Sequence, residues 1–262
     1  MRGRNIAWLL LVCLGIAATI AAGNGWVRYR RWCRLIDDKP QMHMLPEAGT
    51  YAPPKESRML DLGYAVIAVP SWIRGPLVEI DSSGAVGIET TPGNYGIAFM
   101  WPAPDHGSEQ DAVTESFRKM APTTDIHSLF DLEKRALQTR RAPWHTLLLM
   151  GTEERRAHCA LLLAKMVYTS SESRILFVEA QGTEAIVREM KHEAMVTLHD
   201  RRTGIMQVAL IAPELDKRDE IIGALINGYR PRPSSGWSRE AIRGLIAAAG
   251  IASKPTVPAA KK

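Results

Sequence analysis

The sequence predicts an α+β fold, an antiparallel sheet with helices packed on one face, preceded by one N-terminal transmembrane helix. Three observations favour this fold. An uncharged apolar stretch stands near the start of the chain, short β-branched runs separated by turn residues follow it, and helical and strand patterns mix after them. With 262 residues, 46% hydrophobic and 23% charged, the chain has the composition of a globular protein with a packed core. We expect a single domain over residues 61–251.

The N-terminal region is predicted to be a signal anchor, with a short basic N-terminus at residues 1–5 and the transmembrane helix at residues 6–27. Ile6–Ala22 holds no charged residue. Its extension to Val27 reaches the roughly 20 residues with which a helix crosses about 30 Å of hydrocarbon. Aromatic and basic residues are interleaved after it, as is typical of the headgroup region. We expect the lipid bilayer to be bound through residues 6–27, with the interface formed by Trp26, Arg28, Tyr29, Arg30, Arg31, Trp32 and Arg34.

A cleaved signal peptide is the alternative interpretation of this segment. Small residues near Ala21 and Ala22 resemble a cleavage site, but the arginines that follow the apolar run oppose export. The orientation of the anchor also stays open. Two arginines precede the predicted span and four follow it, a bias that weakly favours a cytoplasmic domain.

Residues 28–60 are predicted to form a basic juxtamembrane segment and a Pro-rich stalk. Pro40, Pro46, Pro53 and Pro54 prevent a helix there, and the segment lacks hydrophobic periodicity. We therefore expect a semi-extended spacer between the bilayer and the domain.

The first part of the domain is predicted to be an antiparallel meander, because short runs rich in β-branched or aromatic residues alternate with Pro and Gly. The expected strands are Gly63–Val69, Leu77–Ile80, Val86–Thr90 and Tyr95–Met100. Helical patterns follow. Ser108 and Ser128 can each cap a helix, the second running through Leu137.

The second part mixes both patterns. Strands are expected at Trp144–Met150, Arg174–Ala180 and Gly204–Ala212, and helices at Thr183–Met195, Glu214–Gly228 and from a Ser238 cap to about Ala249. Glu153–Tyr168 fits either a helix or a strand. Residues 252–262 are predicted to be a disordered tail.

The charge distribution argues against nucleic acid as a partner. The net charge is +5, but residues 1–34 hold six arginines and no acid, and the tail adds Lys254, Lys261 and Lys262. The body between them therefore carries about −4, whereas a nucleic-acid-binding domain gathers positive charge on its folded surface.

Several short motifs suggest chemistry, but each lacks a necessary residue. Asp81–Ala85 resembles an aspartic-protease loop with one serine too many and no second copy, so a hairpin turn is expected. His192 begins an HExxH-like run but Val196 stands where the second zinc ligand belongs, and His199 lies seven residues on. We expect a solvated helix face there.

Two further candidates are weaker. Gly84, Gly87, Gly93 and Gly96 lack the Gly-Lys-Ser/Thr of a phosphate loop and are expected in turns or bulges. His158–Cys159 lacks an identifiable base and orienting group, so a buried structural cysteine is expected. No cofactor and no metal site are predicted.

The hypothesis favoured by the sequence is a membrane-anchored, non-catalytic interaction or scaffold protein that meets a protein partner. Trp72 and Trp101, each near a proline at a strand end, close a core edge or line a partner surface. The alternatives are a membrane-bound enzyme with a non-local active site, or a small-ligand or lipid-binding domain. Residues that such an enzyme would bring together are His106, His127, His145 and Asp81.

Overall fold

The computed structural model describes residues 42–80, 85–100, 103–104, 119, 126, 128–169, 174–212, 215, 217–232 and 239–253. The predicted anchor, its seven interface residues, the helix after Ser108 apart from Lys119, and the tail beyond Ser253 lie outside these ranges. No helix within the described ranges is long and apolar enough to span a membrane.

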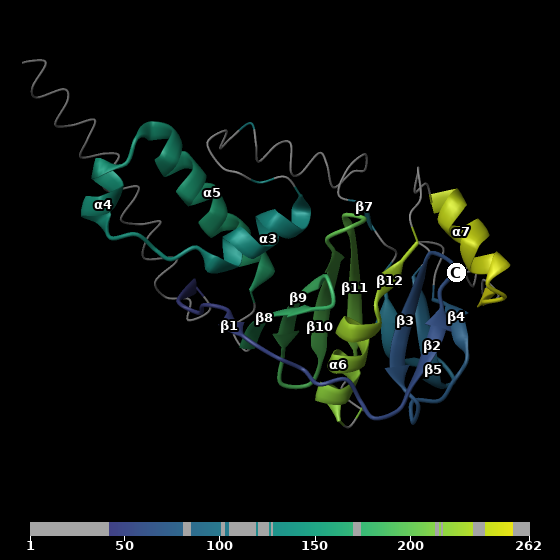
Figure 1. Cartoon of the computed structure of the whole chain (residues 1–262). Helices are drawn as coiled ribbons and strands as arrows, with labels where there is room; N and C mark the ends of the chain where they lie inside the picture. Colours follow the sequence, from purple (N-terminus) through teal and green to yellow (C-terminus); the bar gives the residue numbers. More distant parts are fainter. Residues whose placement is uncertain are drawn as a thin grey trace, which may run out of the picture.

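A large sheet dominates the described part of the chain (Figure 1). Its order is β1-β8-β9-β10-β11-β6-β5-β4-β13, with β7 pairing beside β6 on β11. Every internal pairing is antiparallel, as predicted, and only the two-residue edge strands β1 and β13 are parallel to their neighbours. The strands are β1 (Glu47–Ala48), β4 (Leu77–Glu79), β5 (Val86–Thr91), β6 (Asn94–Phe99), β7 (Ala103–Pro104), β8 (Arg174–Ala180), β9 (Thr183–Glu189), β10 (Ala194–Asp200), β11 (Ile205–Ile211) and β13 (Ala252–Ser253).

A second, three-stranded sheet packs with helix α6 on one face of the large sheet. It consists of β2 (Ser57–Asp61), β3 (Ala65–Pro70) and β12 (Arg230–Pro231), with β3 in the middle. Helix α6 (Arg218–Gly228) contacts both β3 and strands β8–β10. The main core therefore lies between the two sheets and α6, and it also includes apolar residues of α7 (Arg239–Ala248).

Helix α3 (Leu129–Gln138) covers the opposite face of the large sheet. Phe130 and Leu137 of this helix cluster with Ile175 of β8 and Ile186 of β9. The expectation that helices pack on one face only is therefore wrong. Its physical reason lies in β8, where consecutive residues are apolar, so both faces of the strand need cover.

The remaining helices extend from α3. Helix α5 (Thr152–Tyr168) packs along α3, and the short α4 (Trp144–Leu149) precedes it. The ambiguous stretch 153–168 is thus helical. The strand predicted at Trp144–Met150 is wrong, because its leucines have high helix propensity and Pro143 precedes the first turn.

Most of the other predicted elements are confirmed, with small shifts in their ends. These are the strands that became β3, β4, β5, β6, β8 and β11, and the helices that became α3, α6 and α7. The Ser128 cap is also confirmed, since its hydroxyl accepts a 2.9 Å hydrogen bond from the backbone N–H of Asp131.

The helix predicted at Thr183–Met195 is wrong, because this stretch forms β9 and the start of β10. Gln181 and Gly182 have φ values of 51° and 87°, the pair of positive values that a tight hairpin turn requires. β9 is thereby folded back onto β8 and is paired on its other edge by β10. The hydrogen bonds and side-chain contacts of these two strand pairings stabilise the strand more than the weak helical pattern of residues 183–195 would stabilise a helix.

Residues 42–60, expected as a spacer without regular structure, contribute β1 and most of β2. Met42 is buried against Leu162 of α5, so this part of the chain packs on the domain. At the other end, Ala252–Ser253 pairs with β4 as β13 instead of belonging to a disordered tail.

Candidate functional site

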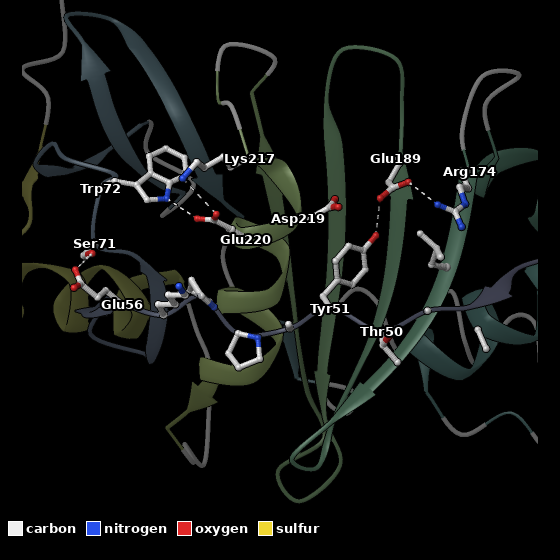
Figure 2. Close-up of a pocket in the computed structure, with 17 residues that line it drawn as sticks. Thr50, Tyr51, Glu56, Ser71, Trp72, Arg174, Glu189, Lys217, Asp219 and Glu220 are labelled. Carbon is white, nitrogen blue, oxygen red and sulfur yellow. Dashed lines mark hydrogen bonds and ion pairs between the residues drawn. The ribbon is translucent and has the colours of Figure 1, made fainter.

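A groove of about 1000 Å³ crosses one side of the domain (Figure 2). Its floor is the extended segment 48–56, and its walls come from β8, β9, the N-terminal end of α6 and the Ser71–Trp72 turn. We call it the 48–56 groove. Five parts of the chain therefore meet there.

The floor of the groove is held by few backbone contacts. The N–H of Gly49 donates to the carbonyl of Phe177 at 2.9 Å, the N–H of Ser71 donates to the carbonyl of Glu56 at 3.2 Å, and the side-chain amide of Asn227 donates to the Tyr51 carbonyl at 3.4 Å. Residues 50–56 take part in no strand ladder among the described residues. The segment lies so close to α6 that a Cβ at Gly223 would be 2.2 Å from the Ala52 carbonyl oxygen. This approach requires glycine at position 223.

One end of the groove is organised around Tyr51. Its hydroxyl donates to Glu189 at 2.6 Å, and Glu189 in turn lies 3.6 Å from Arg174. Arg174 also pairs with Glu47 at 2.8 Å. Burial, together with the hydrogen bond to Glu189, raises the pKa of the Tyr51 hydroxyl above its ordinary value. Tyr51 is therefore a neutral hydrogen-bond donor at physiological pH.

The other end of the groove presents Trp72. Its indole Nε1 donates to Glu220 at 3.0 Å, and Lys217 lies 3.4 Å from the same carboxylate. The ring remains 38% exposed. A fixed aromatic side chain with an open face is typical of a binding surface, because it loses little conformational freedom on contact.

Asp219 lies between the two ends (Figure 2). Within the described residues no ion pair or side-chain hydrogen bond involves its carboxylate, whereas Glu56, Glu189 and Glu220 each have a partner. The side chain is exposed. The middle of the groove therefore offers a carboxylate ready to accept a cationic group.

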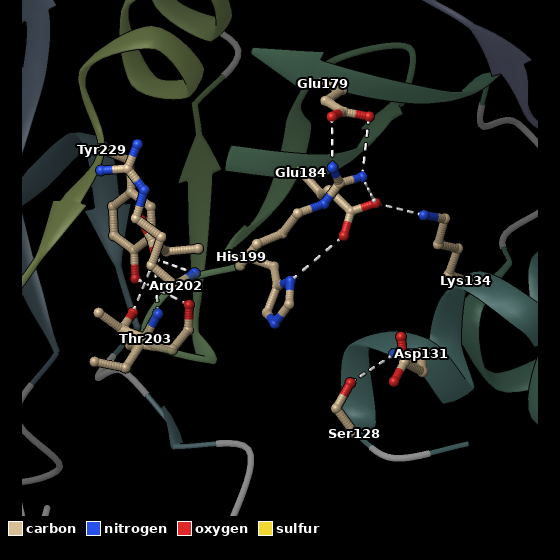
Figure 3. A network of polar contacts seen from close by, with 12 residues as sticks. Ser128, Asp131, Lys134, Glu179, Glu184, His199, Arg202, Thr203 and Tyr229 are labelled. Carbon is tan, nitrogen blue, oxygen red and sulfur yellow. Dashed lines mark hydrogen bonds and ion pairs between the residues drawn. The ribbon is translucent and has the colours of Figure 1, made fainter. Parts of the chain in front are cut away.

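A separate polar network on the α3 face centres on Glu184 (Figure 3). Its carboxylate accepts from Lys134 at 2.5 Å and from Arg201 at 2.8 Å, and His199 lies 3.7 Å away. These contacts, above all those with His199 and Arg201, hold the pKa of Glu184 well below its usual range. His199 also stacks on Phe130 at 4.6 Å. The network joins α3 to the sheet.

A smaller, basic pocket of about 320 Å³ lies beside α5 and is lined by Met42, His43, Leu45, Arg140 and Arg141. We call it the basic pocket. Next to it, the buried Lys165 ammonium donates to the carbonyls of Met44 at 2.7 Å and Thr139 at 3.0 Å. Burial lowers the pKa of Lys165 to about 8. Lys165 thus ties residue 44 to the connection between α3 and α4.

We expect this lysine to give stability a distinct pH dependence. Between pH 8 and the ordinary value of 10.5, the unfolded chain binds more protons at Lys165 than the folded chain does. Folding therefore becomes more favourable as pH rises through that window. The free energy of unfolding of the wild type, measured relative to Lys165→Met by urea titration, should rise by up to about 3 kcal/mol. Lys191→Met, at an exposed position, is the control, and parallel pH curves for wild type and Lys165→Met would contradict the role.

The histidines and the cysteine of the candidate motifs lie on different elements of the structure. His192 is exposed in the β9–β10 turn and His199 lies in β10, so neither is on the expected helix face. His158 of α5 accepts from the N–H of Ala142 at 3.3 Å, and burial lowers its pKa. Cys159 is half-buried.

Three of the four glycines belong to the β5–β6 hairpin, but only Gly93 is in a turn as expected, because Gly87 and Gly96 lie within strands β5 and β6. Gly93 is in the turn with a φ of 87°, and Gly87 packs against Tyr95. Within the described ranges, no cluster of three or more His, Cys, Asp or Glu side chains could hold a metal ion. Several candidates lie outside the described residues or have undescribed side chains: Asp81, Gly84, Trp101, His106, His127 and His145.

The groove residues were not recognisable from the sequence. Tyr51 fell in the predicted stalk, and Asp219 belonged to an ordinary first turn of a helix, where acidic residues are common. The only available signal was Trp72, for which a partner surface was one of two interpretations.

Comparison with known proteins adds no assignment: the chain matches no family model, no curated protein and no solved structure. A function therefore has to be argued from the geometry of the groove.

Proposed function

We propose that this protein is a membrane-anchored interaction protein whose 48–56 groove binds an extended segment of a protein partner. The observation that carries the proposal is the groove itself, with an exposed Trp72 at one end, Tyr51 at the other and the Asp219 carboxylate between them. The anchor at residues 6–27 is the prediction from sequence, and it would hold this groove near a bilayer.

An extended segment fits the groove better than a compact small molecule does. The groove is long and open, its floor is an extended chain, and its backbone groups at residues 50–56 are outside any described ladder. A bound segment can pair with such backbone groups while its alternate side chains reach the walls. Trp72 would supply the apolar anchor.

The charges of the groove favour a basic residue in the bound segment. Arg174 and Lys217 are engaged with Glu189 and Glu220, whereas Asp219 in the middle of the groove and Lys55 on its floor have no described partner. A lysine or arginine of the partner would meet Asp219. The proposed partner is therefore an extended segment with a basic residue near an apolar or proline residue.

Photocrosslinking from within the groove tests whether a protein partner binds there. A benzoylphenylalanine at Lys55, in the groove, should yield a discrete adduct with one protein, whereas the same probe at the exposed Arg202 should not. Trp72→Ala should weaken binding about 30-fold, the effect of losing a hot-spot side chain, and Asp219→Lys should also reduce the adduct. Glu240→Lys, an exposed charge reversal on α7, is the matched control.

The decisive step is a charge exchange with the partner. Once mass spectrometry has mapped the contacted segment, its basic residue is changed to aspartate, which should restore binding to the Asp219→Lys protein. An adduct that is insensitive to both groove substitutions, or a contacted segment without a basic residue, would contradict the proposal.

A further inference from the structure

Helices α4 and α5 lie at one end of the molecule, beyond α3 and away from most of the large sheet, whereas α7 lies at the opposite end (Figure 1). This α4–α5 end exposes large apolar side chains. Leu149, the last residue of α4, is 88% exposed, and Leu163 of α5 is 51% exposed. Leu149 is the most exposed of the five large apolar side chains that are exposed among the described residues, so a contact that covers it would remove apolar surface from water.

Basic side chains flank α4 along the chain, and Arg155 donates to the carbonyl of Met150, the neighbour of Leu149. Arg140 and Arg141 are exposed just before α4, and Arg155 and Arg156 are exposed in the first turns of α5. His43, also exposed, lines the basic pocket beside Arg140 and Arg141. Among the described residues from 140 to 156 the exposed acids are Glu153 and Glu154, so arginine predominates in this stretch. Leucine beside arginine is the combination that binds the interface of an anionic bilayer.

The part of the domain that follows the predicted membrane span in the sequence also packs at the α4–α5 end. Met42 is buried against Leu162 of α5, and Lys165 holds the next turn of chain through the Met44 carbonyl. Only 14 residues, 28–41, separate Met42 from the predicted end of the span at Val27. A fully extended chain of that length reaches about 50 Å at most. The α4–α5 end is therefore the part of the domain tied closest to the bilayer.

We propose that the α4–α5 end is a second membrane contact, which rests on anionic lipid with Leu149 at the acyl boundary and lipid phosphates in the basic pocket. This inference shares the predicted anchor with the proposed function but concerns a different surface. It fixes the orientation of the domain, because a body held at two points on a bilayer cannot rotate freely about its tether.

The test uses the full chain, reconstituted into phosphatidylcholine vesicles with or without phosphatidylglycerol. In a background with Cys13, Cys33 and Cys159 replaced by alanine, an environment-sensitive fluorophore is attached at Leu149→Cys. Met59→Cys is the control, since Met59 is 56% exposed on β2, away from α4. Nitroxide-labelled lipids should quench the probe at position 149 in anionic vesicles and leave the probe at position 59 bright.

Charge reversal then tests the basic pocket. Arg140→Glu should reduce the quenched population at position 149 by about fivefold or more, because each basic side chain near an anionic surface contributes about that factor. Added salt should act in the same direction. Arg202→Glu, an exposed charge reversal in the β10–β11 turn, should leave the quenching unchanged.

The outcomes separate this inference from the anchor. Carbonate extraction followed by flotation reports on the anchor alone. A chain that floats with equal quenching at positions 149 and 59 would overturn the second contact and leave the anchor standing. A chain that carbonate removes, but whose position 149 is quenched before extraction, would overturn the anchor and support the second contact. Shielding of position 149 only after a protein is added would also overturn the lipid contact.

Discussion

Glu133→Leu is expected to lower the free energy of unfolding by about 3–5 kcal/mol, because it leaves the Arg188 guanidinium buried without its counter-charge. Glu133 of α3 and Arg188 of β9 form an ion pair, and their side chains are only 6% and 8% exposed. Thr197 lies 3.4 Å from the Glu133 carboxylate, and the Arg188 guanidinium lies 5.8 Å from the centre of the Tyr168 ring.

The surroundings of the pair offer little compensation. Burial raises the pKa of Glu133, against the opposing effects of Arg188 and Thr197, whereas arginine stays charged at any pH that a folded protein tolerates. The Nε of Arg188 has no hydrogen-bond partner among the described residues, and its Nη1 reaches only Met195 Sδ at 3.1 Å and Thr197 at 3.5 Å. Without Glu133 the cation would have no strong acceptor.

The double variant Glu133→Leu/Arg188→Met distinguishes the net contribution of the ion pair to the free energy of unfolding from the cost of leaving one charge buried alone. We expect its stability to be within about 1 kcal/mol of the wild type, or higher, because an apolar replacement removes both desolvation penalties. Urea unfolding with an unchanged dependence on denaturant is the measurement. Glu179→Leu, which breaks an exposed pair with Arg201, should cost less than about 1 kcal/mol. If Glu133→Leu and Glu179→Leu lowered the free energy of unfolding by the same amount, burial would not be what makes the loss of Glu133 costly.

Gly223→Ala is expected to distort the groove and to destabilise the domain by about 1–3 kcal/mol, the usual range for overpacking. The added methyl would lie 2.2 Å from the Ala52 carbonyl oxygen and 3.5 Å from the Tyr51 side chain. The first neighbour is backbone, so the segment at residues 51–53 has to move away from α6. The groove floor and the Tyr51–Glu189 hydrogen bond would move with it.

Gly244→Ala on α7 is the matched control for Gly223→Ala. A Cβ at Gly244 meets no atom within 4 Å, so the substitution should stabilise the protein by about 0.5–1 kcal/mol through helix propensity alone. Urea unfolding compares the two variants, and crosslinking at Lys55 reports on the groove. If Gly223→Ala were as stable as Gly244→Ala and crosslinked like the wild type, the close approach of residues 51–53 to α6 would be incorrect.

Local sequence patterns predicted the elements whose signals are local. β8 contains a run of four apolar residues, and the Ser128 cap and the apolar side of α6 are encoded within one or two helical turns. β9 was missed because its strand character depends on pairing with β8 and β10. The Gln181–Gly182 turn was the one local signal that could have revealed it.

The groove was beyond the reach of sequence reasoning for a related reason. Tyr51 and Glu189 are 138 positions apart, and Trp72 and Glu220 are 148 positions apart. No spacing rule relates such pairs, and their proximity follows only from the packing of α6 against β3 and strands β8–β10. The two-sided cover of β8, in contrast, could have been inferred from its consecutive apolar residues, which need burial on both faces.

The two short parallel strands at the ends of the large sheet have a consequence for its association behaviour. β1 and β13 come from the first and last stretches of the described chain, and each pairs only two residues of its neighbour, β8 or β4. An open strand edge is a template for pairing with another chain, and short terminal strands are one way in which proteins blunt it. β1 and β13 both lie outside the domain bounds of 61–251 predicted from the sequence, yet they cover the two edges of the sheet. A chain trimmed to those bounds would leave the outer edges of β8 and β4 open to pairing with another chain.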